Sequence, residues 1–398
     1  MRNFSVFLFC AFAFTAFCQV NSQSQEINSN SNSNSISIPA VEESIPTQQE
    51  KSIEQDKFIN IPATKKDLKE RADNQTAAAE SSLQLITSSF FLAKQLASTQ
   101  RSQRSPTVDQ QVQMDNLVQV LEKSSPESFE YHYFKFVAGN YSVALVEHLK
   151  KAELLRPTNS DVHIQFAAYY WCMNEMEKSL LYLEKLVASG RLSSSIIDYS
   201  EDLLSSVPSQ GTLVTHGMED SYACLYQQLS KKIRTDVKVV SLDLLQSEAY
   251  QKQLAIYSFN LPQNNTIGVA YLNSFCVQNN TRNIALSMTI PKEYLLPIQE
   301  NLFVTGLVFE YKSDLSYQNF ARNDYLWNYE FTTKRILNAT KEKEKQLSAN
   351  YLPMLLLLRN NYALANETEK LALVEKALNQ VAAQSRKQEQ IQKMKSSD

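Results

Sequence analysis

The side chains of this sequence that could do chemistry gather in one short polar segment, residues 216–221, which read HGMEDS. This segment follows an apolar run and precedes a helical pattern. It should therefore form the turn at the carboxyl end of a strand, where open α/β sheets bind ligands. His216, Glu219 and Asp220 could act there as acid, base or ligands. The first amides of the helix beyond Asp220 could hold an anion or hydroxyl groups.

The same residues also have a purely structural interpretation. Asp220 or Ser221 would cap the following helix, and Gly217 would supply a positive φ in the turn. His216 would then be a surface residue at the end of the strand. The sequence leaves both interpretations open.

Arg234 and Asp236 form a second candidate group, either as ligand-binding residues or as a pair that stabilises the turn before the next strand. The sequence contains none of the motifs GxSxG, HExxH, GxGxxG or the P-loop. Its other histidines are dispersed along helical segments. We therefore expect a protein that is not an enzyme, with no catalytic residues, no cofactor and no metal site.

Composition and cysteine usage narrow the partners further. The chain has 398 residues, long enough for two or three domains, and 39 basic against 42 acidic side chains give a net charge of −3. This balance offers no attraction to nucleic acid, which we exclude as a partner. Cys172, Cys224 and Cys276 show no CxxC spacing, so we expect buried free thiols, with one disulfide as the alternative.

The first 18 residues are typical of a signal peptide, with Arg2, an apolar stretch at 4–17 and a cleavage site before residue 19. A short membrane anchor and lipid attachment at Cys18 are the alternatives. Residues 19–75 are rich in Ser and Asn, which predicts a disordered tether or a segment that folds on a partner. No later run is long enough to span a bilayer. We expect an exported protein, periplasmic or associated with the cell surface.

Residues 76–207 carry a helical pattern with an internal repeat. Gly139-Asn140-Tyr141 recurs 35 residues later as Asn174-Glu175-Met176, a period typical of helical hairpins. The second copy resembles a tetratricopeptide repeat at Phe166 and Tyr170, among others. Such repeats present a groove to a partner. The expected groove residues are Phe166, Tyr170, Tyr141 and Tyr133.

Residues 208–335 should form a small α/β domain, with strands near 211–215, 237–242, 283–288 and 302–311. Strands alternating with helical patterns predict a mostly parallel, Rossmann-like sheet. Residues 336–398 return to a helical hairpin, with a turn at 365–368. The predicted fold class is thus α plus α/β, with tetratricopeptide-like hairpins on both sides of the sheet.

The segment GTLVTHGMEDSYACLYQQLSKKIRTDVKVVSLDLL, together with the later NLFVTGLVFEYK, resembles the soluble C-terminal region of bacterial membrane proteins related to protein O-mannosyltransferases. Gly217, Asp220 and Ser221 match the turn of that region, while His216 and Glu219 depart from it. The residues that lead into the second strand of that region are matched here by Arg234, Asp236 and Val237. The resemblance implies a shared extracytoplasmic module without transferase activity, because the catalytic part of those proteins lies in their membrane region.

Two functions follow from these observations. The first is a non-catalytic scaffold of the cell envelope that binds a protein or peptide partner through its helical repeats. The alternative is an accessory module that binds a carbohydrate or metabolite at the 216–221 turn.

Overall fold

The computed structural model describes residues 81–95, 103–263, 266–331 and 342–395. The predicted signal peptide and the predicted tether at 19–75 lie outside the described residues.

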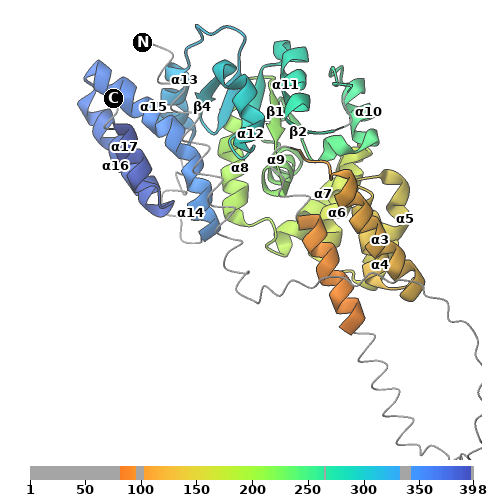
Figure 1. Ribbon diagram of the computed structural model, residues 1–398. Helices are drawn as coiled ribbons and strands as arrows, with labels where there is room; N and C mark the ends of the chain where they lie inside the picture. Colours follow the sequence, from red (N-terminus) through yellow and green to blue (C-terminus); the bar gives the residue numbers. More distant parts are fainter. Residues whose placement is uncertain (1–80, 96–102, 264–265, 332–341, 396–398) are drawn as a thin grey trace, which may run out of the picture.

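Helices dominate the first half of the described chain. A helix at 81–95 is followed by α3 (Val108–Ser124), α4 (Phe129–Ala138), α5 (Val146–Leu155), α6 (Ser160–Cys172), α7 (Met176–Ala188) and α8 (Ser194–Ser206). Side-chain caps define several of the starts, as at Thr107, whose hydroxyl accepts from the Gln110 amide. The turns after α4 and α6 contain residues with positive φ, Asn140 and Asn174 among them. Consecutive helices therefore pack as hairpins (Figure 1).

A mixed sheet of five strands lies at the centre. The strands are β1 (Thr212–Thr215), β2 (Lys238–Ser241), β3 (Ile284–Ser287), β4 (Leu302–Thr305) and β5 (Val308–Tyr311), in the order β2-β1-β3-β5-β4. The pairs β1–β2 and β1–β3 are parallel, whereas β3–β5 and β4–β5 are antiparallel. The prediction of a mostly parallel sheet is therefore wrong, although the parallel half is present.

The connections between the strands are helical. β1 leads into α9 (Met218–Lys231), and β2 leads into η2 (Leu244–Gln246), α10 (Glu248–Ile256) and α11 (Val269–Gln278). After β3 come α12 (Lys292–Leu295) and η4 (Leu296–Asn301).

The mixed character of the sheet comes from Gly306. Residues 302–311 were predicted as one strand, but they form the hairpin β4–β5, with a tight turn at Gly306 and Leu307. Gly306 has a φ of 55°, which favours glycine. Its amide donates to Asn323 Oδ1 at 2.8 Å, and the amide of Leu307 donates to Ser206 Oγ at 2.9 Å. The chain therefore reverses where the apolar pattern alone suggests continuation.

The remaining helices cover the other side of the sheet from α3–α7 (Figure 1). They are α13 (Phe320–Tyr325), the π-helical turn η5 (Leu326–Glu330), α14 (Glu342–Ser348), η7 (Ala349–Tyr351), α15 (Leu352–Ala365), α16 (Thr368–Gln384) and α17 (Gln388–Lys395). Asn366 has a φ of 57° between α15 and α16, so the predicted turn at 365–368 is confirmed.

Two hydrophobic cores hold these elements together. The larger runs from Ala167 through the strands to Met394 in α17, and the smaller lies between Phe90 and Phe166. The boundary between the cores therefore falls within α6. The three remaining cysteines are buried free thiols, as expected. Within the described residues, no helix is both long and apolar enough to cross a membrane.

Candidate functional site

The turn after β1 is fixed by its backbone. Gly217 has a φ of 82° and precedes α9, which begins at Met218. The helix thus begins before Asp220 and Ser221, and the prediction that one of them caps it is wrong. The expected positive φ of Gly217 is confirmed. The amide of Gly217 donates to Asp243 Oδ2 at 3.0 Å, which ties the end of β1 to the residues after β2.

Asp220 lies between the carboxyl ends of β1 and β3, where the connections leave the sheet in opposite directions. Its side chain is buried and accepts hydrogen bonds from Ser287 Oγ at 2.5 Å and from the hydroxyl of Thr289. Burial raises the pKa of Asp220 to about 7, although both hydroxyl donors oppose this shift. The carboxyl group is thus committed to contacts within the protein.

Ser221 belongs to a separate hydroxyl network. Its Oγ lies 2.7 Å from Thr215 Oγ1 and donates to Ser241 Oγ at 3.2 Å. All three residues are buried. The network joins the ends of β1 and β2 to the first turn of α9, so Ser221 contributes to the packing of this edge.

Three charged residues that the sequence did not single out complete this edge of the sheet. Arg104 Nε donates to Asp243 Oδ1 at 2.6 Å, and the side chains in this ion pair are only 10% and 13% exposed. Burial acts to raise the pKa of Asp243, but Arg104, His216 and the Gly217 amide together hold the pKa below its usual value. Lys94 donates to Asn140 Oδ1 at 3.3 Å, and burial lowers its pKa to about 8.

Arg104 reaches this position because its backbone is held by the α/β part of the chain. Its amide donates to the carbonyl of Ile267 at 2.6 Å, and Ser105 Oγ accepts from the Ile267 amide at 3.2 Å. Gln103 forms a β-bridge with Gly268. Residues 103–105 therefore act as a strap that joins the helical part to the sheet.

His216 differs from the expected surface residue. Its Nε2 atom is buried and has no hydrogen-bond partner among the described residues. Burial, reinforced by the charge of Arg104, lowers the pKa of His216 to about 3, so the imidazole is neutral at physiological pH. Glu219 is partly exposed and near enough to oppose this shift. Among the described residues of the predicted turn, His216 is the one with a buried side-chain atom that lacks a hydrogen-bond partner.

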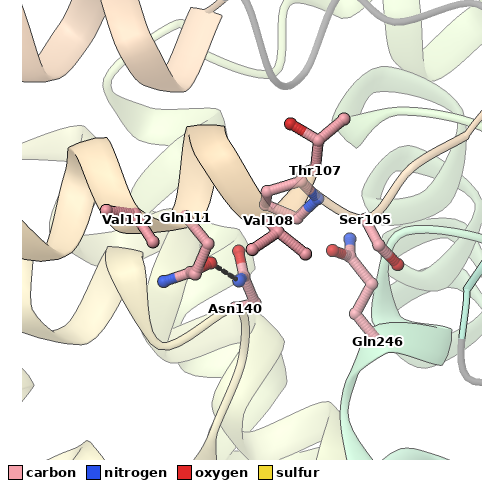
Figure 2. Close-up of a pocket in the computed structure, with 8 residues that line it drawn as sticks. Ser105, Thr107, Val108, Gln111, Val112, Asn140 and Gln246 are labelled. Atoms are coloured by element: carbon pink, nitrogen blue, oxygen red, sulfur yellow. Dashed lines mark hydrogen bonds between the residues drawn. The ribbon is translucent and has the colours of Figure 1, made fainter.

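A hollow of about 390 Å³ opens beside the strap. It lies between the start of α3, the turn after α4 and η2, as Figure 2 shows. Its walls carry amides, hydroxyls and aliphatic side chains, from Ser105, Pro106, Thr107, Val108, Gln111, Val112, Asn140 and Gln246. Asn140 Nδ2 donates to Gln111 Oε1 at 2.7 Å, and Gln246 Nε2 donates to the carbonyl of Asp243 at 3.1 Å. We call this space the strap hollow.

The second predicted group lies at the opposite end of the sheet. Arg234 and Asp236 precede β2, so they stand at the amino ends of the parallel strands. Their side chains form an ion pair with Nε and Oδ1 2.9 Å apart, which confirms the expected pairing. Arg234 lowers the pKa of Asp236 to about 2. The structure thus separates Arg234 and Asp236 from the 216–221 turn.

The four expected groove residues are divided between core and surface. Phe166 and Tyr133 are buried, whereas Tyr141 and Tyr170 are partly exposed. Tyr182, which the sequence did not single out, stacks on Phe166 with ring centroids 4.7 Å apart. The aromatic residues are thus mainly hairpin packing, with Tyr170 at its exposed margin.

Comparison with known proteins found a match to one family model. Residues 196–393 match the family model described as TMEM260-associated domain 2. This segment runs from α8 to α17 and includes the whole sheet, but neither the strap nor α3–α7. No curated protein and no solved structure matches the chain.

The Arg104–Asp243 pair predicts a large stability effect. Arg104→Met leaves the Asp243 carboxylate buried without its guanidinium, and we expect a loss of about 3–5 kcal/mol in the free energy of unfolding. The control is Lys252→Met, whose pair with Glu248 is exposed on both sides, at 72% and 82%, so its loss should leave the stability nearly unchanged. Urea denaturation measures both. Equal losses of unfolding free energy in the two variants would contradict a larger contribution from the buried ion pair.

Asp220 predicts a pH-dependent stability. Its folded pKa lies above the unfolded value, so the folded state binds more protons between about pH 4 and pH 7 and loses stability as the pH rises. In Asp220→Asn, the free energy of unfolding should fall by up to about 4 kcal/mol less over this pH range than in the wild type. Burial also raises the pKa of Asp202 to about 7. The stability of the variant should therefore still fall with pH, but less steeply. Unfolding measured across this range tests the sign, and an unchanged slope would contradict the assignment.

Proposed function

We propose that this chain is an exported, non-catalytic binding protein that recognises an extended segment of a protein partner at the strap hollow. The supporting observation is the chemistry of its walls. Carboxamides such as those of Asn140 and Gln246 can donate to a peptide carbonyl and accept from a peptide amide. The volume lies at the small end of the range for ligand sites, which suits a short segment.

Exposed aliphatic side chains at the rim of the strap hollow favour a peptide over a wholly polar ligand. Val108 is 80% exposed and Val112 is 51% exposed, and they lie one turn apart on α3. They would cover an apolar side chain of the partner while the amides pair with its backbone. A contact confined to a hollow of this volume supports recognition of moderate affinity.

The helical hairpins support the scaffold part of the proposal. Their turns carry the positive-φ residues Asn140 and Asn174, 34 residues apart and close to the period noted in the sequence, and Asn140 forms part of the hollow. We propose that the hairpins are tetratricopeptide-like and that they hold the hollow against the sheet. The match of residues 196–393 to a TMEM260-associated domain fits an accessory module, and the lack of transferase activity is part of the proposal.

The absence of catalysis is also part of the proposal. Asp220 accepts from two hydroxyls, and Asp243 accepts from Arg104 and the Gly217 amide. Carboxylates occupied in this way are poorly placed to act as a general base. Binding without chemical transformation is therefore the function that these contacts favour.

The peptide proposal can be tested by selecting phage-displayed peptides on the intact chain. Enriched peptides should bind Val112→Asp at least about ten-fold more weakly, because the substitution places a charge beside the apolar contact. The matched control is Leu181→Asp on α7, since Leu181 is 57% exposed and lies outside the hollow. Failure to enrich peptides, or equal weakening by both substitutions, would refute the proposal.

A second candidate function rests on His216. Its unused Nε2 could bond to a hydroxyl of a carbohydrate or metabolite once the side chains that cover this edge of the sheet move aside. Neutral monosaccharides should then raise the unfolding temperature of the wild-type chain, because they bind the folded state alone. His216→Phe keeps an aromatic ring but removes the nitrogen, so the rise should vanish. A rise that survives in this variant would place the ligand elsewhere.

A further inference from the structure

A second hollow, of about 530 Å³, lies at the amino ends of the parallel strands. Its polar walls come from four separate segments of the chain, and they carry Arg234, Asp236, Glu310, Lys312, Tyr317 and Arg322. We call this space the arginine hollow. It lies across the sheet from the strap hollow and wholly within the segment matched by the family model.

Two of the cations in the arginine hollow are balanced by carboxylates. Arg234 pairs with Asp236 through two nitrogens, at 2.9 and 3.0 Å. Lys312 lies 3.0 Å from Glu310 on β5, whose side chain is only 2% exposed. Tyr317 completes the surroundings of this buried carboxylate by donating its hydroxyl to both oxygens, at 3.2 and 3.1 Å.

The third cation, Arg322, has no carboxylate partner among the described residues. One of its terminal nitrogens donates to the carbonyl of Ser205 at 2.7 Å, near the end of α8. Arg234 also reaches this carbonyl, with Nη1 3.5 Å away, so two guanidinium groups converge there. Two carboxylates therefore face three cations, and the arginine hollow carries one uncompensated positive charge.

A guanidinium has five N–H donors in a planar fork, and one backbone carbonyl uses only part of them. The remaining edge matches the two oxygens of a carboxylate or a phosphate. We propose that the arginine hollow binds a small ligand through a single anionic group, a carboxylate or a phosphate ester, with Arg322 as its main partner. Arg234 and Lys312 add positive charge to the site, while their carboxylates limit the ligand to one anionic group.

The test compares Arg322→Gln with a matched control. Glutamine can still donate to the Ser205 carbonyl but has no charge and no fork. The control is Arg282→Gln, because Arg282 likewise donates to backbone carbonyls, at 3.0 and 2.6 Å, and stacks on an aromatic ring, but does not line the hollow. The probes are inorganic phosphate, glucose 1-phosphate, acetate and glucuronate, added to the full chain at constant ionic strength made up with sodium chloride.

We expect at least one of these anions to raise the unfolding temperature and to bind measurably by calorimetry. Arg322→Gln should weaken that binding about ten-fold or more, and Arg282→Gln should leave it unchanged. The responding probe distinguishes the two sources of the charge, phosphate ester or carboxylate. A wild-type chain that responds to none of the four anions, or an Arg322→Gln variant that binds as the wild type does, would overturn the proposal.

Discussion

The carboxyl end of the sheet depends on the carboxylate of Asp243. One oxygen accepts from Arg104 and the other from the Gly217 amide, so a single side chain joins the end of β2, the turn after β1 and the strap. Replacing such a buried pair by apolar groups is often neutral, but removing one partner is costly. Asp243 therefore acts mainly by positioning other elements. It sets where the helical part meets the sheet and where the strap hollow opens.

The sheet edge that usually receives a ligand in α/β folds is closed here by the protein itself. Asp220 is held by Ser287 and Thr289, and the hydroxyl of Ser221 bonds within the edge. A ligand at the switch point would have to displace these bonds. Space for binding remains further out, along residues 105–112, where the helical part adds a wall that the sheet alone lacks. This arrangement supports the proposed recognition at the seam between the two parts.

Local patterns predicted much of this fold, and long-range contacts account for most of what they missed. The positive φ of Gly217 and the turn at Asn366 follow from nearby residues, and both are confirmed. Gly306 was visible too, but the apolar residues on both sides favoured one strand. The partners of Asp220 are 67 and 69 residues away, and Arg104 is 139 residues from Asp243. No spacing rule links positions so far apart, so the ion pair and the strap hollow emerge only from the fold.

The two ends of the sheet also differ in electrostatics, for a reason that lies in α8. The last carbonyls of a helix form the negative end of its dipole and lack intrahelical donors. Arg234 and Arg322 supply donors to the carbonyls of Leu204 and Ser205. Capping and the helix dipole explain why cations lie there, but the helix end carries only about half an elementary negative charge. Two guanidiniums at one helix end, with a single carboxylate bonded to them, leave a charge that capping does not require, and that charge lies where the chain leaves a hollow beside the sheet.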